Sequence, residues 1–237
     1  MIYITGDTHR KFKRIKEFPF EKGDMLIILG DAGINFTLDM HDVILKEKLK
    51  KLNVTLFCIR GNHEERPENI DTYQEIELFG GKVFIEPNYP NLIFAKDGEI
   101  YNIGDYKVLV IGGAYSVDKY YRELYGFRWF KDEQLSQEEM INIYNKIKSN
   151  NFDIVLTHTC PFKYIPTEEF IPDLDQSTVD NTMEYFFDQV EESITYDKWY
   201  CGHFHTDKRK EKIRFMFHDI EEFNKELTKE DTKTLIK

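Results

Sequence analysis

The stretch IYITGDTH, residues 2–9, places a short apolar run directly before a polar cluster that contains Asp7 and His9. The same arrangement returns along the chain. It is seen in MLIILGD (25–31), VTLFCIRGNHE (54–64), DIVLTH (153–158) and KWYCGHFH (198–205). In an open α/β sheet, ligands bind in the crevice beyond the carboxyl ends of the strands. The polar clusters are therefore predicted to converge on one site.

Around the first three clusters, short apolar runs alternate with helical patterns. Strands are predicted at 2–5, 25–29 and 54–59, with helices near 10–18 and 38–51 between them. This βαβαβ order implies parallel strands.

The middle of the chain has a different pattern, because its apolar runs follow one another without helices between them. Asp97-Gly98 separates two alternating runs, which is a strong hairpin signal. These strands are therefore predicted to be antiparallel and to form a second sheet or a sheet edge. The runs cover 82–86, 91–95, 99–103 and 106–111.

The last part of the chain returns to alternating elements. A helix near 136–149 is expected to begin at Ser136 as N-cap, with Glu139 at the third helical position. An acidic, proline-containing connection at 161–177 has a length typical of a lid or a locally disordered segment. The other expected elements are a strand at 152–157, a helix near 178–190, a strand ending at Cys201, a return strand near 212–217 and a charged C-terminal helix.

The composition indicates a globular protein with a sizeable core. Of 237 residues, 41% are hydrophobic and 32% are charged, so residues 1–237 are expected to form one domain. The simplest closure is an α/β fold of two sheets packed face to face, with helices outside. A net charge of -11 makes an extended nucleic-acid partner or a nuclease activity unlikely on electrostatic grounds.

The cysteines and the N-terminus bear on location. Cys58, Cys160 and Cys201 are expected to be buried free thiols in a reducing cytosol. The chain opens without a basic leader, and no apolar stretch approaches the ~20 residues that span a bilayer. A cytoplasmic protein with no membrane partner is expected.

Two pairs of polar residues have a spacing that suits a metal ion. Asp7 and His9 are two residues apart, and so are His203 and His205. On an extended segment such residues point the same way, so both members of a pair can reach one ion.

Single residues complete a candidate ligand set. Asp31 ends its own strand, and its two carboxylate oxygens could bridge two cations; Asn62 offers an amide oxygen and His158 an imidazole. A mixed oxygen and nitrogen set without thiolate suits Mn, Fe or Zn. His41 and His218 lie outside any cluster and are expected to have no such role.

Taken in order, the clusters resemble the motifs of calcineurin-like metallophosphoesterases over residues 6–205. The resemblance implies a four-layer α/β/β/α sandwich of two mixed sheets with flanking helices, and hydrolysis of phosphate monoesters or diesters. The motifs are Gly6-Asp7-Thr8-His9, Gly30-Asp31, Gly61-Asn62-His63-Glu64, His158 and Gly202-His203-Phe204-His205.

The resemblance also implies roles for single residues. It implies two divalent metal ions, most simply Mn, with Fe, Zn or Mg as alternatives, and a hydroxide between them that attacks phosphorus. Asp31 would bridge the ions, and His63 would assist the leaving oxygen or steady the phosphoryl group. The first metal would be held by Asp7, His9, Asp31 and His205, and the second by Asp31, Asn62, His158 and His203.

Two arginines are candidate phosphate contacts. Arg60 resembles the arginine of the Arg-Gly-Asn-His-Glu motif of Ser/Thr protein phosphatases, and Arg122 lies in a possible substrate loop that begins at Gly112. Those phosphatases carry an Asp-Arg pair after the second motif, whereas this chain has Ala32-Gly33 after Asp31. This difference puts membership of the protein phosphatases in question and leaves the residue that orients His63 unidentified.

Several functions remain open from the sequence. The substrate could be a phosphorylated small molecule, a nucleotide or a phosphoprotein. A non-catalytic scaffold of the same fold is a further alternative, although the chain retains every ligand. A metallo-β-lactamase-like hydrolase would need a His-x-His-x-Asp-His cluster, which the sequence lacks.

Overall fold

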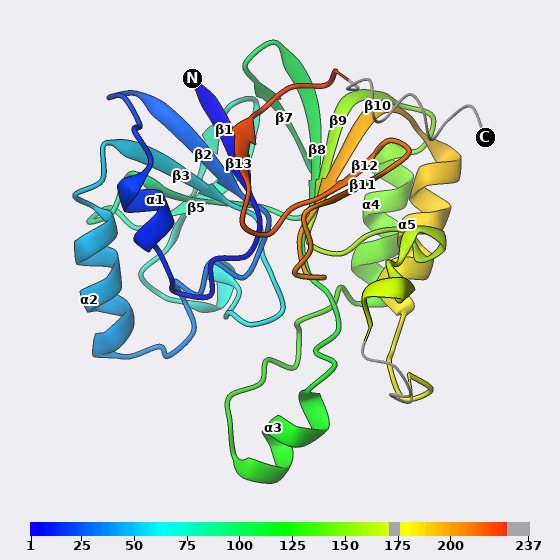
Figure 1. The fold of residues 1–237 in the computed structure, drawn as a ribbon, viewed down its shortest axis with the longest axis horizontal. Helices are drawn as coiled ribbons and strands as arrows, with labels where there is room; N and C mark the ends of the chain where they lie inside the picture. The colour runs from blue at the N-terminus through cyan, green and yellow to red at the C-terminus, as the bar shows by residue number, and fades with distance from the viewer. Residues whose placement is uncertain (171–175, 227–237) are drawn as a thin grey trace.

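The computed structural model describes residues 1–170 and 176–226 of the chain. Two mixed sheets pack face to face, with α1 (Lys13–Glu17) and α2 (Met40–Leu49) outside one and α4 (Gln137–Ile147) and α5 (Thr182–Ser193) outside the other (Figure 1). This is the four-layer arrangement that the sequence predicts.

The first sheet contains seven strands in the order β13-β1-β2-β3-β6-β5-β4. β1, β2, β3 and β6 run parallel to one another, whereas β13, β5 and β4 pair antiparallel with their neighbours. The bounds are β1 (Ile2–Thr5), β2 (Asp24–Ile28), β3 (Val54–Cys58), β4 (Gln74–Leu78), β5 (Gly81–Ile85), β6 (Leu92–Ala95) and β13 (Ile220–Glu222).

The second sheet contains six strands in the order β11-β12-β10-β9-β8-β7. β8, β9, β10 and β12 are parallel, and the two edge strands are antiparallel to their neighbours. The bounds are β7 (Glu99–Ile103), β8 (Tyr106–Ile111), β9 (Asn151–Thr157), β10 (Thr195–Cys201), β11 (Lys208–Lys210) and β12 (Ile213–Phe215).

Alternating side chains explain why the layers hold together. Along β8, Val108 and Val110 face the first sheet, whereas Leu109 and Ile111 pack beneath α4 and α5. Burial of apolar side chains contributes about 25 cal/mol per Å², so a strand buried on both faces is strongly held in the interior. The outer face of the first sheet is covered in the same way by Ile15 of α1 and Leu49 of α2.

Most of the predicted elements are confirmed. The parallel strands β1, β2 and β3 alternate with α1 and α2, and α4 begins with the predicted capping box. Glu139 N donates to Ser136 Oγ over 3.3 Å, and Ser136 N donates to Glu139 Oε2 over 2.7 Å. The cysteines are free and buried, as expected.

The predicted hairpin at Asp97-Gly98 is wrong. β6 and β7, which flank it, lie in different sheets, so this turn carries the chain from one sheet to the other. β6 is buried on both faces and therefore lies inside the first sheet rather than at its edge. Consecutive strands of this region pair antiparallel at Gly104-Asp105, between β7 and β8, and also between β5 and β6.

The C-terminal part also differs from expectation. The predicted return strand is β12, but it runs parallel to β10 because β11 makes the reversal first. In the C-terminal region, where a charged helix was expected, β13 adds antiparallel to β1. Residues 227–237, on which the rest of this prediction falls, lie outside the described residues. The sequence analysis also missed β4, β11 and α3 (Lys119–Tyr125).

The connection at 161–177 is described only in part. Its first ten residues contain two short 3-10 helices, Phe162–Tyr164 and Thr167–Glu169, while 171–175 lie outside the described residues. A third short 3-10 helix covers Pro67–Asn69. Across the described residues, no helix has both the length and the apolar character needed to cross a bilayer.

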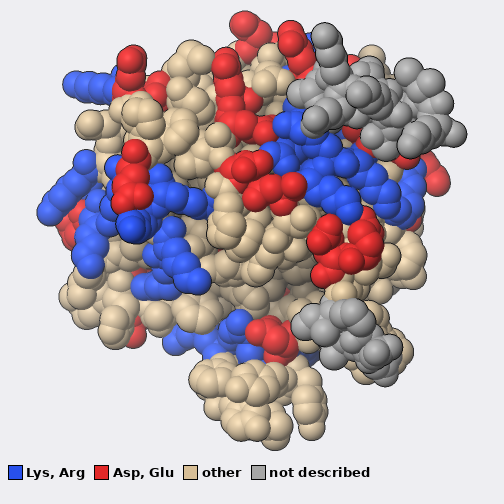
Figure 2. Space-filling view, in the orientation of Figure 1, with Lys and Arg blue, Asp and Glu red and all other residues tan. Residues whose placement is uncertain are grey.

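The segment around α3 projects from the body of the molecule (Figure 1). In the space-filling view the side of its tip that faces the viewer shows mainly uncharged side chains, whereas acidic and basic side chains mix over the rest of this face (Figure 2). The exposed apolar side chains are Val117, Tyr120, Tyr121, Leu124, Tyr125 and Phe127.

Candidate metal centre

The five polar clusters leave their strands at one edge of the sandwich. The last residues of the first three strands are paired side by side, Thr5 with Ile28 and Ile28 with Cys58. In the second sheet, Thr157 pairs with Cys201 in the same way. Because these strands are parallel within each sheet, the loops that follow them begin at the same level and can meet.

Several predicted ligands have a strained backbone. The φ angles of His9, Asp31, His203 and His205 are 43°, 46°, 66° and 51°, in the left-handed region that residues other than glycine rarely adopt. Such conformations cost free energy and cluster at functional sites. Here the strain turns each loop sharply after its strand.

Glycines in these clusters allow ligands from other loops to come close. A Cβ atom on Gly61 would lie 2.0 Å from Asp31 Oδ1, and one on Gly30 would lie 2.1 Å from His158 Nδ1. Gly30 also has a positive φ of 93°, which favours glycine. These positions are therefore restricted to glycine by the neighbouring side chains.

The first group of candidate ligands consists of Asp7, His9 and His205, whose ligand atoms lie within 4.8 Å of one another. The Nε2 atoms of the two histidines are 2.8 Å apart. Asp7 Oδ2 lies 3.3 Å from His205 Nε2 and 3.7 Å from His9 Nε2. This oxygen is buried and has no hydrogen-bond partner among the described residues.

The second group is centred on His158, which is fully buried. Its Nδ1 donates to the carbonyl of Leu29 over 2.7 Å, so Nε2 is left as the free ligand atom. Asn62 Oδ1 lies 2.8 Å from this Nε2, and Asp31 Oδ1 lies 3.7 Å from it. Asp7 belongs to this group as well as to the first.

Asp31 lies between the two groups. Its Oδ2 is 3.8 Å from His9 Nδ1, while its Oδ1 faces His158 and accepts the backbone N–H of His63. The two oxygens therefore face different groups, so Asp31 could contribute to both if each held an ion. His203 is beside the second group, with its ring centroid 5.0 Å from that of His158.

Electrostatics favour the ligand form of Asp31, His203 and His9, whereas the contact with Asp7 raises the pKa of His205. Burial raises the pKa of Asp31, but His158, His63 and His9 outweigh it and lower the net value to about 2. Burial, together with His158, lowers the pKa of His203 to about 3, and burial also lowers the pKa of His9. Near neutral pH the carboxylate is ionised and these two imidazoles are neutral, so both can donate electron pairs.

Two residues that the sequence did not assign a role hold Asn62 in place. Asn62 Nδ2 donates to Ser116 Oγ over 2.9 Å, and Ser116 Oγ donates to Glu133 Oε2 over 2.5 Å. Glu133 also accepts the backbone N–H of Ser116 over 3.0 Å. This chain of bonds fixes the amide so that its oxygen faces His158. The predicted substrate loop thus contains a residue that contacts a candidate ligand.

Glu64 is another buried group that no sequence argument assigned. It accepts the backbone N–H groups of Gly61 and Gly33 over 3.4 and 3.2 Å and so joins two of the loops. Burial and the charge of Asp31 raise its pKa to about 8. The only sequence signal was its place in the third cluster.

His63 lines a cavity of about 400 Å³ together with Asp31, Asn62, His203 and His205. Its imidazole makes no hydrogen bond within the described residues. Burial lowers its pKa, Asp31 opposes that shift, and Arg122 adds to it. The ring is therefore neutral near neutral pH and available to a ligand in the cavity.

Arg122 lies on α3, close enough to His63 to lower its pKa. Its Nε donates to Asp118 over 2.7 Å, and its Nη1 donates to the carbonyl of Arg128 over 3.1 Å. Asp118 itself lines the cavity with His63. The structure thus brings Arg122 to the margin of the site.

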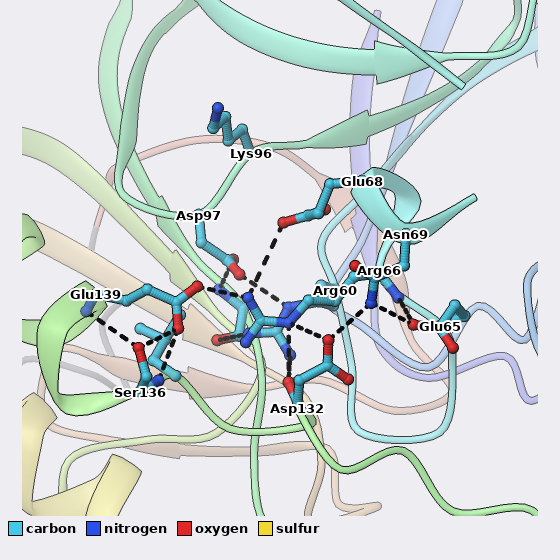
Figure 3. Close-up of polar contacts among 12 residues, drawn as sticks. Arg60, Glu65, Arg66, Glu68, Asn69, Lys96, Asp97, Asp132, Ser136 and Glu139 are labelled. Carbon is cyan, nitrogen blue, oxygen red and sulfur yellow. Dashed lines mark hydrogen bonds and ion pairs between the residues drawn. The ribbon is translucent and has the colours of Figure 1, made fainter. Parts of the chain in front are cut away.

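Arg60 does not fit its predicted role. Its side chain is 3% exposed, and its guanidinium donates to Asp97 over 2.8 Å and to the carbonyl oxygens of Glu133 and Gly112 over 2.6 and 3.3 Å. Figure 3 shows it beside Arg66 in one network with Asp97 and Asp132. The predicted phosphate contact is corrected: protein oxygens already occupy this guanidinium, which holds the loops behind the site.

The remaining histidines lie outside the ligand groups. His41 is exposed near the start of α2, and its Nδ1 is 3.1 Å from Asp39. His218 stacks near Phe217, whose ring lies 4.5 Å from that of His205. Neither belongs to the ligand groups found among the described residues.

The donor set fits divalent cations. Electron-pair donors converge in both groups: two imidazole nitrogens in one, and an imidazole nitrogen and an amide oxygen in the other, each pair 2.8 Å apart. An unpartnered buried carboxylate oxygen is costly, and the one on Asp7 lies beside the first pair. Oxygen and imidazole ligands suit Mn, Fe and Zn.

A comparison with protein families agrees with this geometry. The family model described as calcineurin-like phosphoesterase matches residues 1–207, a span that includes both ligand groups and His63. A search of curated proteins finds no match to the chain. Because the family match covers most of its length, the chain belongs to the calcineurin-like phosphoesterases, a family of metal-dependent enzymes that act on phosphoesters.

Proposed function

We propose that the protein hydrolyses phosphate monoesters or diesters of small molecules, using two divalent metal ions, most simply Mn. The observation that carries this proposal is the convergence of the two ligand groups around Asp7 and Asp31. We assign the first ion to Asp7, His9, Asp31 and His205, and the second to Asp31, Asn62, His158 and His203.

When bound, such a pair of cations supplies a water of lowered pKa and neutralises charge on the phosphoryl oxygens. The chain's own residues hold and orient the substrate. Burial keeps the His63 imidazole neutral, and we assign its N–H to a hydrogen bond with the leaving oxygen. Arg122, held by Asp118 at the margin of the cavity, is assigned to an outer phosphoryl oxygen.

The size of the cavity is compatible with the small substrate that we propose. It measures about 400 Å³, within the range of small-molecule sites. The buried free cysteines support our further proposal of a reducing, cytoplasmic location.

The test is hydrolysis of an aryl phosphate and a bis-aryl phosphate by the Mn-loaded protein, compared with His63→Ala and Arg122→Ala. We expect turnover to fall by roughly 100-fold for the first variant and tenfold for the second, with unchanged metal content. Lys13→Ala, an exposed change on α1, is the control. If the protein purifies without stoichiometric metal and hydrolyses neither ester, it is a scaffold and the proposal fails.

A further inference from the structure

Two further cavities adjoin the ligand groups. The larger has a volume of about 680 Å³, and its lining includes His203 and Phe204. The smaller has a volume of about 290 Å³ and lies between the first ligand group and α1, since Asp7, His9 and Arg14 are part of its lining. The proposed reaction assigns no role to the smaller cavity, which is distinguished by its charge.

The smaller cavity is close to the reaction site. The ring centroid of His9, which lines this cavity, lies 5.8 Å from that of His63. Because we assign His63 to the leaving oxygen, an alcohol that leaves there can extend past His9 into the cavity. A substrate can therefore place its reacting phosphate at the ligand groups and a second group here.

The chain is basic where it forms this cavity. Residues 10–16 contain five basic side chains and no acidic one, although the net charge of the whole chain is -11. Three of the five line the cavity, namely Lys11, Lys13 and Arg14. Figure 2 shows basic side chains gathered over the side of this face that carries α1 and α2. A cleft with basic walls raises the local concentration of anions.

Lys11 keeps its N–H donors unused. Its side chain is exposed and forms no ion pair or hydrogen bond among the described residues. Its charge acts to lower the pKa of His205, against the larger effect of Asp7, so Lys11 lies close to the first ligand group. By contrast, Lys13 lies 3.8 Å from Glu17, an acidic residue of α1 that also lines the cavity.

Arg14 is a half-buried charge beside the ligands. Its Nη2 donates to the carbonyl oxygen of Asp7 over 3.1 Å, and its Nη1 is buried without a partner among the described residues. Burial lowers the pKa of this guanidinium, and Asp207, Asp7 and Asp219 oppose that shift. However, Asp207 already accepts three backbone N–H groups, and Asp219 pairs with Arg214. An anion in the cavity would stabilise the charge of Arg14 through space and need not reach Nη1.

We infer that this cavity is an anion subsite in which Lys11 and Arg14 hold a second phosphate of the substrate, carried by the leaving alcohol. Lysine and arginine suit this role because charge-assisted hydrogen bonds to phosphate are strong. The substrate class is then a small molecule with two phosphate groups. The inference rests on the proposed function for the reaction, but not for the binding of phosphate.

The first test counts bound phosphate. Equilibrium dialysis of the Mn-treated protein against radiolabelled inorganic phosphate gives the number bound per chain. Lys11→Glu should lower this number by one, whatever the metal content, because it reverses a charge at the subsite. Lys16→Glu, an exposed change on α1 outside the lining of the cavity, is the matched control and should leave the number unchanged. An equal number in the wild type and in Lys11→Glu overturns the inference.

The second test separates this inference from the proposed function. Alkanediol bisphosphates of increasing length are compared with the hydroxyalkyl monophosphates of the same length, with phosphate release corrected for the two equivalent esters. One length of bisphosphate should have a kcat/KM at least roughly tenfold above that of its monophosphate. Lys11→Ala should remove this preference, and Lys11→Arg should keep it. Arg14 is left unchanged because it also binds the Asp7 carbonyl group.

The outcomes of the two tests distinguish the two proposals. Equal efficiency for both esters at every length, or an equal loss of the preference in Lys16→Ala, overturns the inference and leaves the proposed function intact. Loss of one bound phosphate in Lys11→Glu, without hydrolysis of either ester by the wild type, overturns the proposed function and supports the subsite.

Discussion

The ligand groups and the neighbouring cavity are held in different ways. Around the ligands, buried groups fix single side chains: Leu29 orients His158, and Ser116 orients Asn62. Around the neighbouring cavity of about 680 Å³, aromatic side chains such as Phe162, which begins a short 3-10 helix, lie among aliphatic and polar ones. Metal ligation needs atoms placed to within fractions of an ångström, whereas apolar contacts tolerate displacement, and the two regions are built accordingly.

The largest effect should come from the residue between the ligand groups. Asp31→Asn removes the charge that faces both groups, so turnover of an aryl phosphate should fall by about a thousandfold or more, with loss of bound metal. Metal content by mass spectrometry and turnover on the same sample measure this. Asp71→Asn, an exposed change, is the control. Retained metal and activity would contradict the account of the ligand groups.

Arg60 should matter for stability more than for chemistry. Arg60→Ala leaves Asp97 and two buried carbonyl groups without their donor, so the free energy of unfolding should fall by about 3 kcal/mol. Urea unfolding with and without metal measures the change. If the variant kept its native stability but lost affinity for phosphate, Arg60 would be a phosphate contact and this account of its role would be contradicted.

Breaking the hydrogen bonds that join Asn62 to Ser116 and Glu133 should have a moderate effect on metal affinity. Glu133→Gln presents an amide N–H to the Ser116 hydroxyl, so the Asn62 amide loses its fixed orientation. Loss of such a supporting partner typically weakens metal affinity by roughly 10- to 100-fold. Calorimetric titration with Mn measures this, with Ser116→Ala as a second variant and Glu138→Gln of α4 as the control. Unchanged affinity in both variants would show that the hydrogen bonds are incidental.

Glu64 should have the smallest effect, a change in pH dependence. Its folded-state pKa of about 8 is raised from 4.5, so between these values the folded protein retains a proton that the unfolded chain loses. Stability of the metal-free protein therefore falls as pH rises through this range. Glu64→Gln should reduce the difference in unfolding free energy between about pH 5 and about pH 8 by about 1 kcal/mol or more. An equal pH dependence in both proteins would contradict the raised pKa.

The sequence predicted the convergence of the polar clusters because these clusters follow regular strands. Asp7, Asp31 and His158 follow apolar runs, and runs that end at one sheet edge bring their next residues together. The fold could be predicted for the same reason. The sequence failed where tertiary contacts decide the path of the chain. At Asp97, whose carboxylate accepts a hydrogen bond from Arg60, the chain crosses from one sheet to the other and forms no hairpin.

The supporting residues outside the polar clusters left no comparable pattern in the sequence. Glu133 and Ser116 are single polar residues within ordinary loop patterns, and only the path of the segment between β8 and α4 brings them to the site. For Arg60, the motif fixes the position of the residue along the chain but not the direction in which its side chain points. Burial and hydrogen-bond partners, which decide that direction, depend on distant residues such as Glu133.

The most direct test is a crystal of this protein soaked in Mn²⁺ and measured at the manganese absorption edge. The account predicts two anomalous peaks: one among Asp7, His9 and His205, and the other among Asn62, His158 and His203, with Asp31 between them. Peaks at other positions, or none at these side chains, would contradict it.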